Sequence, residues 1–348
     1  MSARAIVFAC VAATAACASP KTPVAEIDVG PPVVMLTPED APIALRRSVV
    51  ADLYFWLRTK VLEGEAPPAF AEAYAAMHDL RSDLAADPTA WEDLEVPLGA
   101  VSSAAELVAI YGELPEKKDV GGRPVSLRKD ALRLARAMAG VEAAFRRGPH
   151  REHEAEIARA ARDLSQRLLP HEARILRAIE SDMAISLLVD GERASRPIVV
   201  TLVGDAPYPG IFAADARGRV MASFVRVKGL DGNALVETVL HESLHAMDEM
   251  TVRESSTAMN MLRAALERRG LGEGDSNVEM AVNTVTFAEA ASLVKRFVDP
   301  AHRPLGESGF YTLYPPAPAI VEAWSRRVDD GEALDHTADA IAAAVTSP

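Results

Sequence analysis

The sequence predicts a mainly helical protein of the α+β class, with a helical region at 38–190 and a second region, 196–348, that contains a small β-sheet. Hydrophobic residues make up 49% of the 348-residue chain and charged residues 25%, the composition of a folded globular protein. Alanine is frequent and aromatic residues are only 5%, which favours helices because alanine loses least on entering one. A β-branched run at 198–203 and strand-like runs near 211–214 and 220–225 predict the sheet, with a hairpin joining the last two.

The N-terminal residues have the features of an export signal. An arginine precedes an apolar core, and small residues surround Cys17. Thr14-Ala15-Ala16-Cys17 resembles the lipobox of bacterial lipoproteins, so we interpret 1–17 as a signal peptide and Cys17 as a lipidation site that anchors the chain to a membrane. Ordinary cleavage that releases a soluble periplasmic protein is the alternative. Recurring prolines at 18–37 predict an extended linker.

Charge excludes one class of partner. The formal net charge is −13, which argues against a surface that neutralises phosphates, so nucleic acid is not an expected partner. The apolar run near the N-terminus is shorter than the roughly 20 residues of a membrane-spanning helix.

Apolar residues recur at three- and four-residue steps through both regions, as in amphipathic helices. The predicted helices of the first region are 39–63, 68–86, 102–112, 124–147 and 150–189, the last interrupted at Pro170. Those of the second region are 233–250, 255–269, 277–298, 317–330 and 335–345. His150, His153 and His171 lie among arginine and glutamate residues, so we interpret them as solvated and assign them no metal.

The most informative motif is His241-Glu242-Ser243-Leu244-His245, an H-E-x-x-H pattern within the predicted helix 233–250. Two histidines four residues apart project from the same side of a helix, one turn apart, and can share one metal ion. The glutamate after the first histidine can reach a water molecule on that metal. The motif therefore indicates a hydrolytic zinc site.

A catalytic zinc site usually has three protein ligands, so a third is expected elsewhere in the chain. Glu289 occupies a core position in the apolar stripe of helix 277–298, and a buried carboxylate must be paired or bind a metal. Glu279 is the alternative, but it stands near the helix start, where a solvated glutamate needs no metal. We therefore prefer Glu289.

These residues resemble a known class of enzymes. The motif continues as His245-Ala246-Met247-Asp248, and Phe287-Ala288-Glu289-Ala290-Ala291 follows with its glutamate 44 residues after His245. This pattern resembles the gluzincin class of zinc metallopeptidases, and most nearly the anthrax lethal factor-like group. The resemblance covers about 197–298. It implies a zincin-like domain with an active-site helix, Zn²⁺ held by His241, His245 and Glu289, Glu242 as the general base, and a peptide or protein substrate.

The resemblance leaves the transition-state donor unassigned. The lethal factor-like group has a tyrosine seven residues before the ligand glutamate, where this sequence has Val282. Tyr311 is the first candidate for the donor, followed by Tyr314 and His302, and each also has a structural interpretation. Asp248 follows the motif on the same helical face, where it either orients a liganding histidine or is an ordinary surface residue.

Two functions of different classes follow. The first is a zinc-dependent metallopeptidase of the bacterial cell envelope, lipid-anchored or periplasmic, in which an exposed strand within 211–225 aligns an extended peptide. The second is a non-catalytic envelope lipoprotein that uses a zincin-like fold as a binding or scaffold module. The absent tyrosine favours the second and the retained Glu242 favours the first, because a scaffold has no use for a general base.

Overall fold

The computed structural model describes residues 33–37, 42–84, 88–120, 122–186, 188–189, 192–193, 198–214, 221–251, 256–272 and 274–347. All of these residues belong to one compact unit, Pro31–Pro348. Both predicted regions, 38–190 and 196–348, thus contribute to the same unit. The predicted signal peptide, Cys17 and most of the predicted linker lie outside the described residues.

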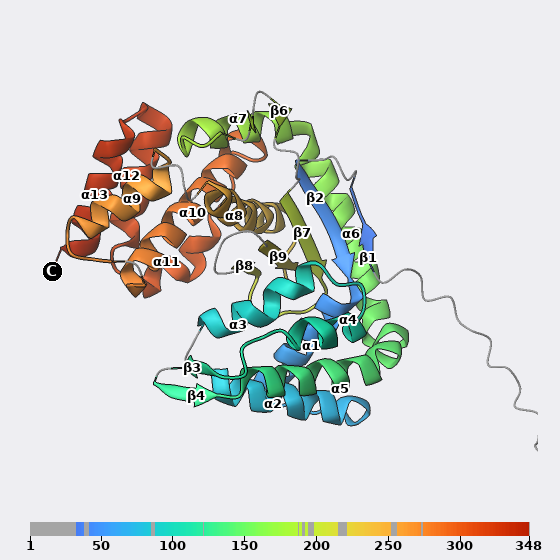
Figure 1. The fold of residues 1–348 in the computed structure, drawn as a ribbon. Coiled ribbons are helices and arrows are strands. Elements are labelled where there is room, and N and C mark those ends of the chain that lie inside the picture. Colours follow the sequence, from blue (N-terminus) through green and yellow to red (C-terminus); the bar gives the residue numbers. More distant parts are fainter. Residues whose placement is uncertain are drawn as a thin grey trace, which may run out of the picture. The chain divides into compact units, whose positions relative to one another are not determined.

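A mixed β-sheet lies among the helices of this unit (Figure 1). Among the described residues its strands are ordered β1-β2-β7-β9-β8, with β2, β7 and β9 mutually parallel and both outer strands antiparallel to their neighbours. The strands are β1 (Val33–Met35), β2 (Ile43–Ser48), β7 (Ile198–Val203), β8 (Gly210–Ala214) and β9 (Met221–Arg226). The predicted strands and the predicted antiparallel pairing of β8 with β9 are confirmed, and β8 is an edge strand.

The start of the first region differs from the prediction. Residues Ile43–Ser48 form strand β2, where the sequence predicted the beginning of a helix over 39–63. Helix α1 (Val49–Glu63) begins only after Ser48, whose side chain accepts a hydrogen bond from the backbone N–H of Ala51. Parallel pairing with β7 decides the conformation of this segment, and such a distant partner overrides local propensity.

The other predicted helices are confirmed with small shifts at their ends, except that the predicted helix 150–189 ends at Asp182 and Leu188–Val189 form a strand. In the first region they are α2 (Ala71–Leu84), α4 (Ala104–Tyr111), α5 (Leu127–Arg147), α6 (Pro149–Arg167) and α7 (Glu172–Asp182). In the second they are α8 (Gly232–Met250), α9 (Ala258–Glu267), α10 (Ser276–Phe297), α12 (Ala317–Asp330) and α13 (Leu334–Thr346). Pro170 separates α6 from α7, as the sequence predicted.

Several short elements were not predicted. Helix α3 (Pro88–Glu95) begins at a proline, a residue that suits the first position of a helix. The short strands are β3 (Lys118–Val120), β4 (Arg123–Val125), β5 (Leu188–Val189) and β6 (Glu192–Arg193). The single helical turns are η1 (Pro68–Phe70), η2 (Val96–Gly99), η3 (Leu169–His171), η4 (Leu305–Ser308) and α11 (Phe310–Leu313).

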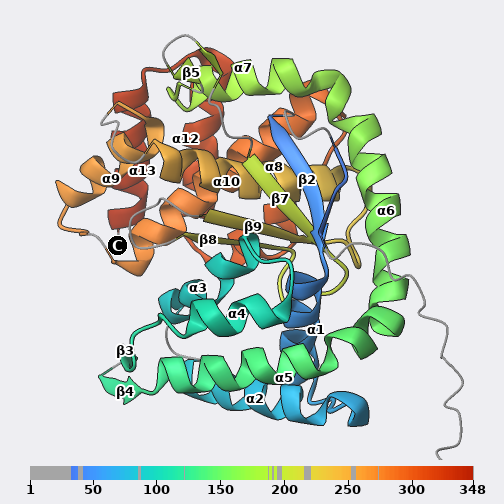
Figure 2. The same cartoon turned by 45° about the vertical axis from the view of Figure 1, so that its right-hand side comes forward.

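Helices cover both faces of the sheet (Figure 2). Ala222 and Phe224 of β9 share a core with α1, α2, α4 and α5, whereas Val225 shares a second core with α6 to α10, α12 and α13. The alternation follows from strand geometry, because successive side chains point to opposite faces. The prediction of a mainly helical α+β protein is confirmed.

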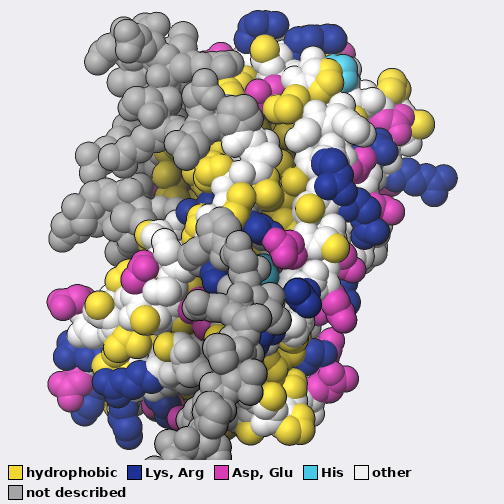
Figure 3. Space-filling view, turned by 90° about the vertical axis from the view of Figure 1, so that its right-hand side faces the viewer, with side chains coloured by type: hydrophobic (Ala, Val, Ile, Leu, Met, Phe, Trp, Pro, Cys, Tyr) yellow, Lys and Arg dark blue, Asp and Glu magenta, His cyan; other side chains and the backbone are white. Residues whose placement is uncertain are grey.

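No helix in the described part of the chain has the length and apolar character of a bilayer-crossing segment. On the face drawn in Figure 3, lysine and arginine side chains are interspersed with aspartate and glutamate. The charges visible on this face are therefore mixed in sign.

A buried polar cluster joins α1, α6 and the end of β7. The carboxylate of Asp52 is fully buried, and its oxygens lie 2.7 Å from His150 Nδ1 and 2.9 Å from His153 Nδ1. It also accepts a 2.7 Å hydrogen bond from the backbone N–H of Gly204. His150 and His153 are 4% and 9% exposed, so their predicted solvation is wrong, while His171 is half-buried. The charged residues next to the two histidines in the sequence lie on other faces of α6, so they do not indicate that the histidines are solvated.

We expect this cluster to make stability depend on pH. Burial of Asp52 opposes its negative charge, but hydrogen bonds to His150 and His153 hold its pKa below the ordinary value. Burial also opposes charge on His153, yet the hydrogen bond and charge of Asp52, aided by Asp205 and Glu156, raise its pKa. The stabilisation from His153 is therefore complete below about pH 6.5 and is lost as pH rises through its folded-state pKa. The stabilisation from Asp52 is lost only as pH falls through its lowered pKa.

Urea unfolding of the parent and of Asp52→Asn tests this expectation. The variant should be less stable by about 3 kcal/mol near pH 6, and the difference should shrink toward about pH 9. His336→Asn, which removes an exposed histidine, should leave the parent's pH dependence unchanged. A difference between parent and Asp52→Asn that stays constant over this range would contradict the assignment.

Candidate metal centre

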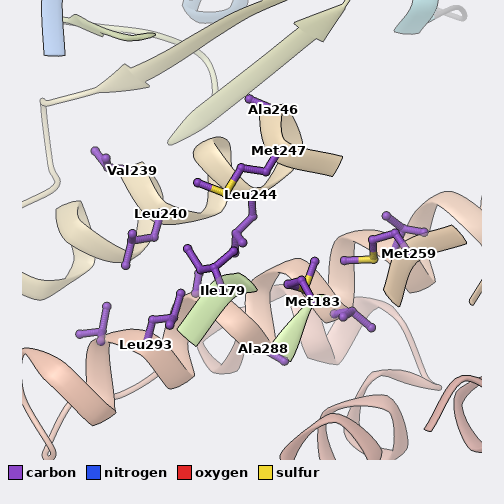
Figure 4. Packing of buried hydrophobic residues seen from close by; sticks show 14 of the residues in the cluster. Ile179, Met183, Val239, Leu240, Leu244, Ala246, Met247, Met259, Ala288 and Leu293 are labelled. Atoms are coloured by element: carbon purple, nitrogen blue, oxygen red, sulfur yellow. The ribbon is translucent and has the colours of Figure 1, made fainter. Parts of the chain in front are cut away.

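Helix α8 carries the H-E-x-x-H motif and is held by its apolar side. Leu240, Leu244 and Met247 share one core with Ile179 of α7 and Leu293 of α10 (Figure 4). The hydroxyl of Ser223 on β9 donates a 3.3 Å hydrogen bond to the backbone carbonyl of Glu242, which ties the helix to the sheet. The adjacent side of α8, which bears the two histidines, therefore faces the edge strand β8.

The two histidines of the motif converge. Their Nε2 atoms are 3.1 Å apart, and the rings meet edge to face. Phe287 of α10 lies against His241 with ring centroids 4.0 Å apart, and Phe212 of β8 stacks on His245 at 5.8 Å. The spacing that the sequence predicted on one helical face is confirmed, and aromatic rings on two other elements limit the movement of both imidazoles.

Glu242 lies beside this pair, with Oε1 3.9 Å from His241 Nε2. Gly210 of β8 permits this position, because a Cβ there would lie 2.1 Å from the same oxygen. Burial raises the pKa of Glu242 to about 8. Two buried atoms, Glu242 Oε2 and His241 Nδ1, have no hydrogen-bond partner among the described residues, which is rare unless a site has a further ligand or role.

The imidazoles are electrically suited to bind a cation. Burial, with the nearby charge of His245, lowers the pKa of His241 well below its ordinary value. Burial likewise lowers the pKa of His245. Both rings are therefore neutral at pH 7, and a neutral imidazole keeps a nitrogen lone pair for a metal.

Asn283 of α10 is the third side chain in this group. Its Oδ1 lies 3.2 Å from His245 Nε2, and its amide also interacts with His241. Asn283 and Phe287 are one turn apart and both face the histidines. Asn283 was not predicted as a site residue, although a polar residue on a mostly apolar helix near the predicted ligand is a recognisable signal.

The structure does not bring Glu289, the predicted third ligand, to the histidines. Glu289 is fully buried, accepts a 2.9 Å hydrogen bond from Trp324 Nε1 of α12, and lies 3.4 Å from Arg296. It follows Asn283 by six residues, which places it about 120° around the helix. In the part of the chain that the structure describes, no three His, Cys, Asp or Glu side chains are grouped to hold a metal. The buried carboxylate has protein partners in place of a metal, while Glu279, the alternative, is exposed.

A cleft of about 700 Å³ opens over the histidines, between β8 and the segment that contains η4 and α11. Its lining residues are Tyr208, Pro209, Gly210, Phe212, Thr238, His241, Glu242, His245, Asn283, Phe287, Leu305, Gly309, Phe310 and Leu313. Glu237 of α8 holds the segment that contains η4 and α11 in place. Its carboxylate is hydrogen-bonded to His302 and accepts a hydrogen bond from the backbone N–H of Leu305. Apart from the motif residues, the lining side chains carry no charge at neutral pH.

The predicted donors lie elsewhere. Tyr311 packs against the core, the hydroxyl of Tyr314 donates to a backbone carbonyl at the start of α10, and His302 is bonded to Glu237. None of the three is among the described residues that line the cleft. Tyr208, in the loop between β7 and β8, lines the cleft and was not predicted as a site residue.

Asp248 fits neither predicted interpretation. It is 7% exposed, so it is not an ordinary surface residue, and Arg263 of α9 donates to its carboxylate through both terminal nitrogens, one at 3.1 Å. The hydrogen bonds that the structure describes for this carboxylate go to Arg263 and not to a histidine. Its charge still favours the protonated form of His245, but its main effect is to join α8 to α9.

The histidine pair fits a zinc ion. Two nitrogens bound at 2.0–2.1 Å to a tetrahedral zinc lie about 3.3 Å apart, close to the 3.1 Å between the Nε2 atoms. Comparison with protein-family models, curated proteins and solved structures finds no match to this chain.

We expect Glu289 to contribute to stability and not to metal binding. Burial and the neighbouring Asp182 raise its pKa, so it is a neutral acid at pH 7 that accepts from Trp324 and Arg296. Glu289→Ala should lower the free energy of unfolding by about 2 to 4 kcal/mol, because it leaves buried donors without an acceptor. Glu289→Gln, a neutral isostere, should cost much less. Urea unfolding monitored by tryptophan fluorescence measures both.

The same variant separates the two roles. Glu289→Gln should keep the parent's zinc content per chain, measured by elemental analysis. Loss of zinc from a Glu289→Gln protein that unfolds like the parent would restore Glu289 as a ligand.

Proposed function

We propose that this chain is a zinc-dependent peptidase in which His241 and His245 hold the metal and Glu242 is the general base. The observation that carries the proposal is the convergence of two neutral imidazoles and a buried carboxyl group at one end of an open cleft. The resemblance of the motif to gluzincin metallopeptidases supports the same activity. The signal-like N-terminus supports export to a bacterial cell envelope, with Cys17 as a lipid anchor or with release into the periplasm.

The chain's own residues account for the proton transfers. Zinc, when bound, supplies the Lewis acidity that makes a water molecule a strong nucleophile near neutral pH. In its ionised form, which a neighbouring cation favours, Glu242 can accept a proton from the attacking water, because its Oε2 has no partner among the described residues. A carboxyl pKa near the working pH lets Glu242 then return the proton to the leaving amine.

The edge of the sheet supports binding of an extended peptide. Among the described strands β8 pairs only with β9, so its outer edge retains backbone groups that can bond another strand. Gly210 and Phe212 of β8 line the cleft. Main-chain hydrogen bonds to this edge would give affinity with little dependence on substrate sequence.

A non-catalytic binding module is the second candidate, and the position of Glu289 favours it. Trp324 and Arg296 donate hydrogen bonds to the carboxyl group of Glu289, which was expected to complete the zinc site. Glu242 favours catalysis, because a buried carboxyl oxygen with no partner among the described residues costs stability that a scaffold has no reason to sacrifice. Peptidase activity is therefore the better-supported candidate.

Glu242→Gln tests the general-base role. The variant should lose peptide cleavage by about 100-fold or more, because an amide cannot accept the proton. Its zinc content and unfolding curve should match those of the parent. Cleavage of an unstructured protein substrate, followed by mass spectrometry of the products, measures the activity.

Glu267→Gln is the matched control, since Glu267 is an exposed glutamate on α9. It should cleave at the parent's rate. Equal cleavage by Glu242→Gln and the parent would exclude the base role, whereas a parent that cleaves no substrate would favour the binding module.

The uncharged cleft predicts a preference for apolar substrates. Leu313 lines the cleft and is 80% exposed, so a substrate side chain can bury it. Leu313→Ser should raise KM about 10-fold for peptides with leucine or phenylalanine beside the cleaved bond, with little change in kcat. Peptides with lysine or aspartate at those positions should be poor substrates of the parent.

Leu169→Ser is the control, because Leu169 is 40% exposed at the junction of α6 and α7 and is not among the cleft residues. It should leave KM unchanged. Equal cleavage of charged and apolar peptides by the parent would show that the cleft does not select substrates.

A further inference from the structure

We propose that the amide oxygen of Asn283 is the third protein ligand of the metal, in the role that the sequence predicted for Glu289. This inference rests on the proposed function, because it takes His241 and His245 as the first two ligands. It departs from the ligand set that the sequence motif implies, and it replaces an anionic oxygen with a neutral one.

The distances support three ligand atoms around one point. Asn283 Oδ1 is 3.2 Å from His245 Nε2, which is in turn 3.1 Å from His241 Nε2. Ligand atoms on a tetrahedral zinc are about 3.3 Å apart, so both separations fit with little movement. The amide also interacts with His241, so it lies within reach of both rings. Each of the three atoms can offer a lone pair to a cation.

The packing of α10 holds Asn283 in this place. Phe287, one turn later, lies with its ring centroid 4.0 Å from that of His241. The hydroxyl of Tyr314 donates to the backbone carbonyl of Asn277 and ties down the start of the helix. Asn283 is half-buried and its amide lines the cleft, so the oxygen faces the histidines from a supported helix.

The other acidic residues of α10 are not placed to compete. Glu289 is held by Trp324 and Arg296 on a different side of the helix. Glu279 is exposed, lies outside the residues that line the cleft, and contributes to the acidic surroundings of Glu92. Asn283 is thus the oxygen-bearing side chain that α10 presents to both imidazoles.

A neutral third ligand has a chemical consequence. Two imidazoles and an amide leave the full charge of the dication in place, whereas a glutamate would cancel half of it. The metal should therefore bind less tightly, because amide oxygens are weaker donors to zinc than carboxylates. Asn283→Asp should reverse this effect, because it places a negative charge on nearly the same atoms.

Zinc affinity of the full chain, measured by competition with a chromogenic chelator, tests the ligand role without recourse to activity. Asn283→Ala should weaken zinc binding by at least about 100-fold, since even loss of an outer-shell partner costs 10- to 100-fold. Asn283→Asp should bind zinc more tightly than the parent. Glu289→Gln and Glu279→Gln are the matched controls on the same helix and should bind as the parent does.

The outcomes separate this inference from the proposed function. A parent chain that binds no zinc would overturn both. A parent that binds zinc, with unchanged affinity in Asn283→Ala, would overturn the ligand role of Asn283 alone, as would loss of zinc in Glu289→Gln or Glu279→Gln only. If Asn283→Ala fails to fold in the absence of metal, Asn283→Asp decides, because unchanged affinity in that variant would equally overturn the proposal.

Discussion

The packing of α10 against α8 is the constraint on which the candidate centre depends. The ring of Phe287 packs against His241, and the amide of Asn283 is within hydrogen-bond distance of His245. Each motif histidine therefore contacts one residue of α10. A histidine pair on an isolated helix would rotate freely about its side-chain bonds. Here the neighbouring helix and Phe212 of β8 surround the rings and direct both Nε2 atoms to one point.

The N-terminal helices take part in the same unit through the sheet. Strand β2 pairs with β7, and the chain after β7 leads directly to Tyr208 at the cleft. Arg58 of α1, which is ion-paired with Glu95, lies 4.1 Å from the ring centroid of Trp91 and 5.9 Å from that of Tyr208. The first region therefore supports one rim of the cleft, so a change in α1 or α3 can reach the site through these aromatic contacts.

Buried acids in this fold are almost all paired, which makes the exception informative. Asp52 has two histidines and a backbone N–H, Glu237 has His302 and a backbone N–H, and Glu289 has an indole N–H and a guanidinium. Glu242 is buried to a similar degree, but Oε2 has no partner among the described residues. Native proteins seldom leave such an atom unbonded unless its chemistry is used. The electrostatic pattern thus distinguishes the candidate base from the structural carboxyl groups.

Local features were decided by the sequence itself. The helix that bears His241 and His245, the break at Pro170 and the hairpin of β8 and β9 follow from periodicity and turn chemistry, which act over a few residues. Pairing between distant segments was decided only by the tertiary structure. It made Ile43–Ser48 a strand and gave Glu289 partners on other helices, and it turned Asn283 toward the histidines. A sequence shows that a buried carboxylate needs a partner, but several partners satisfy the same energetic requirement, and only packing selects one.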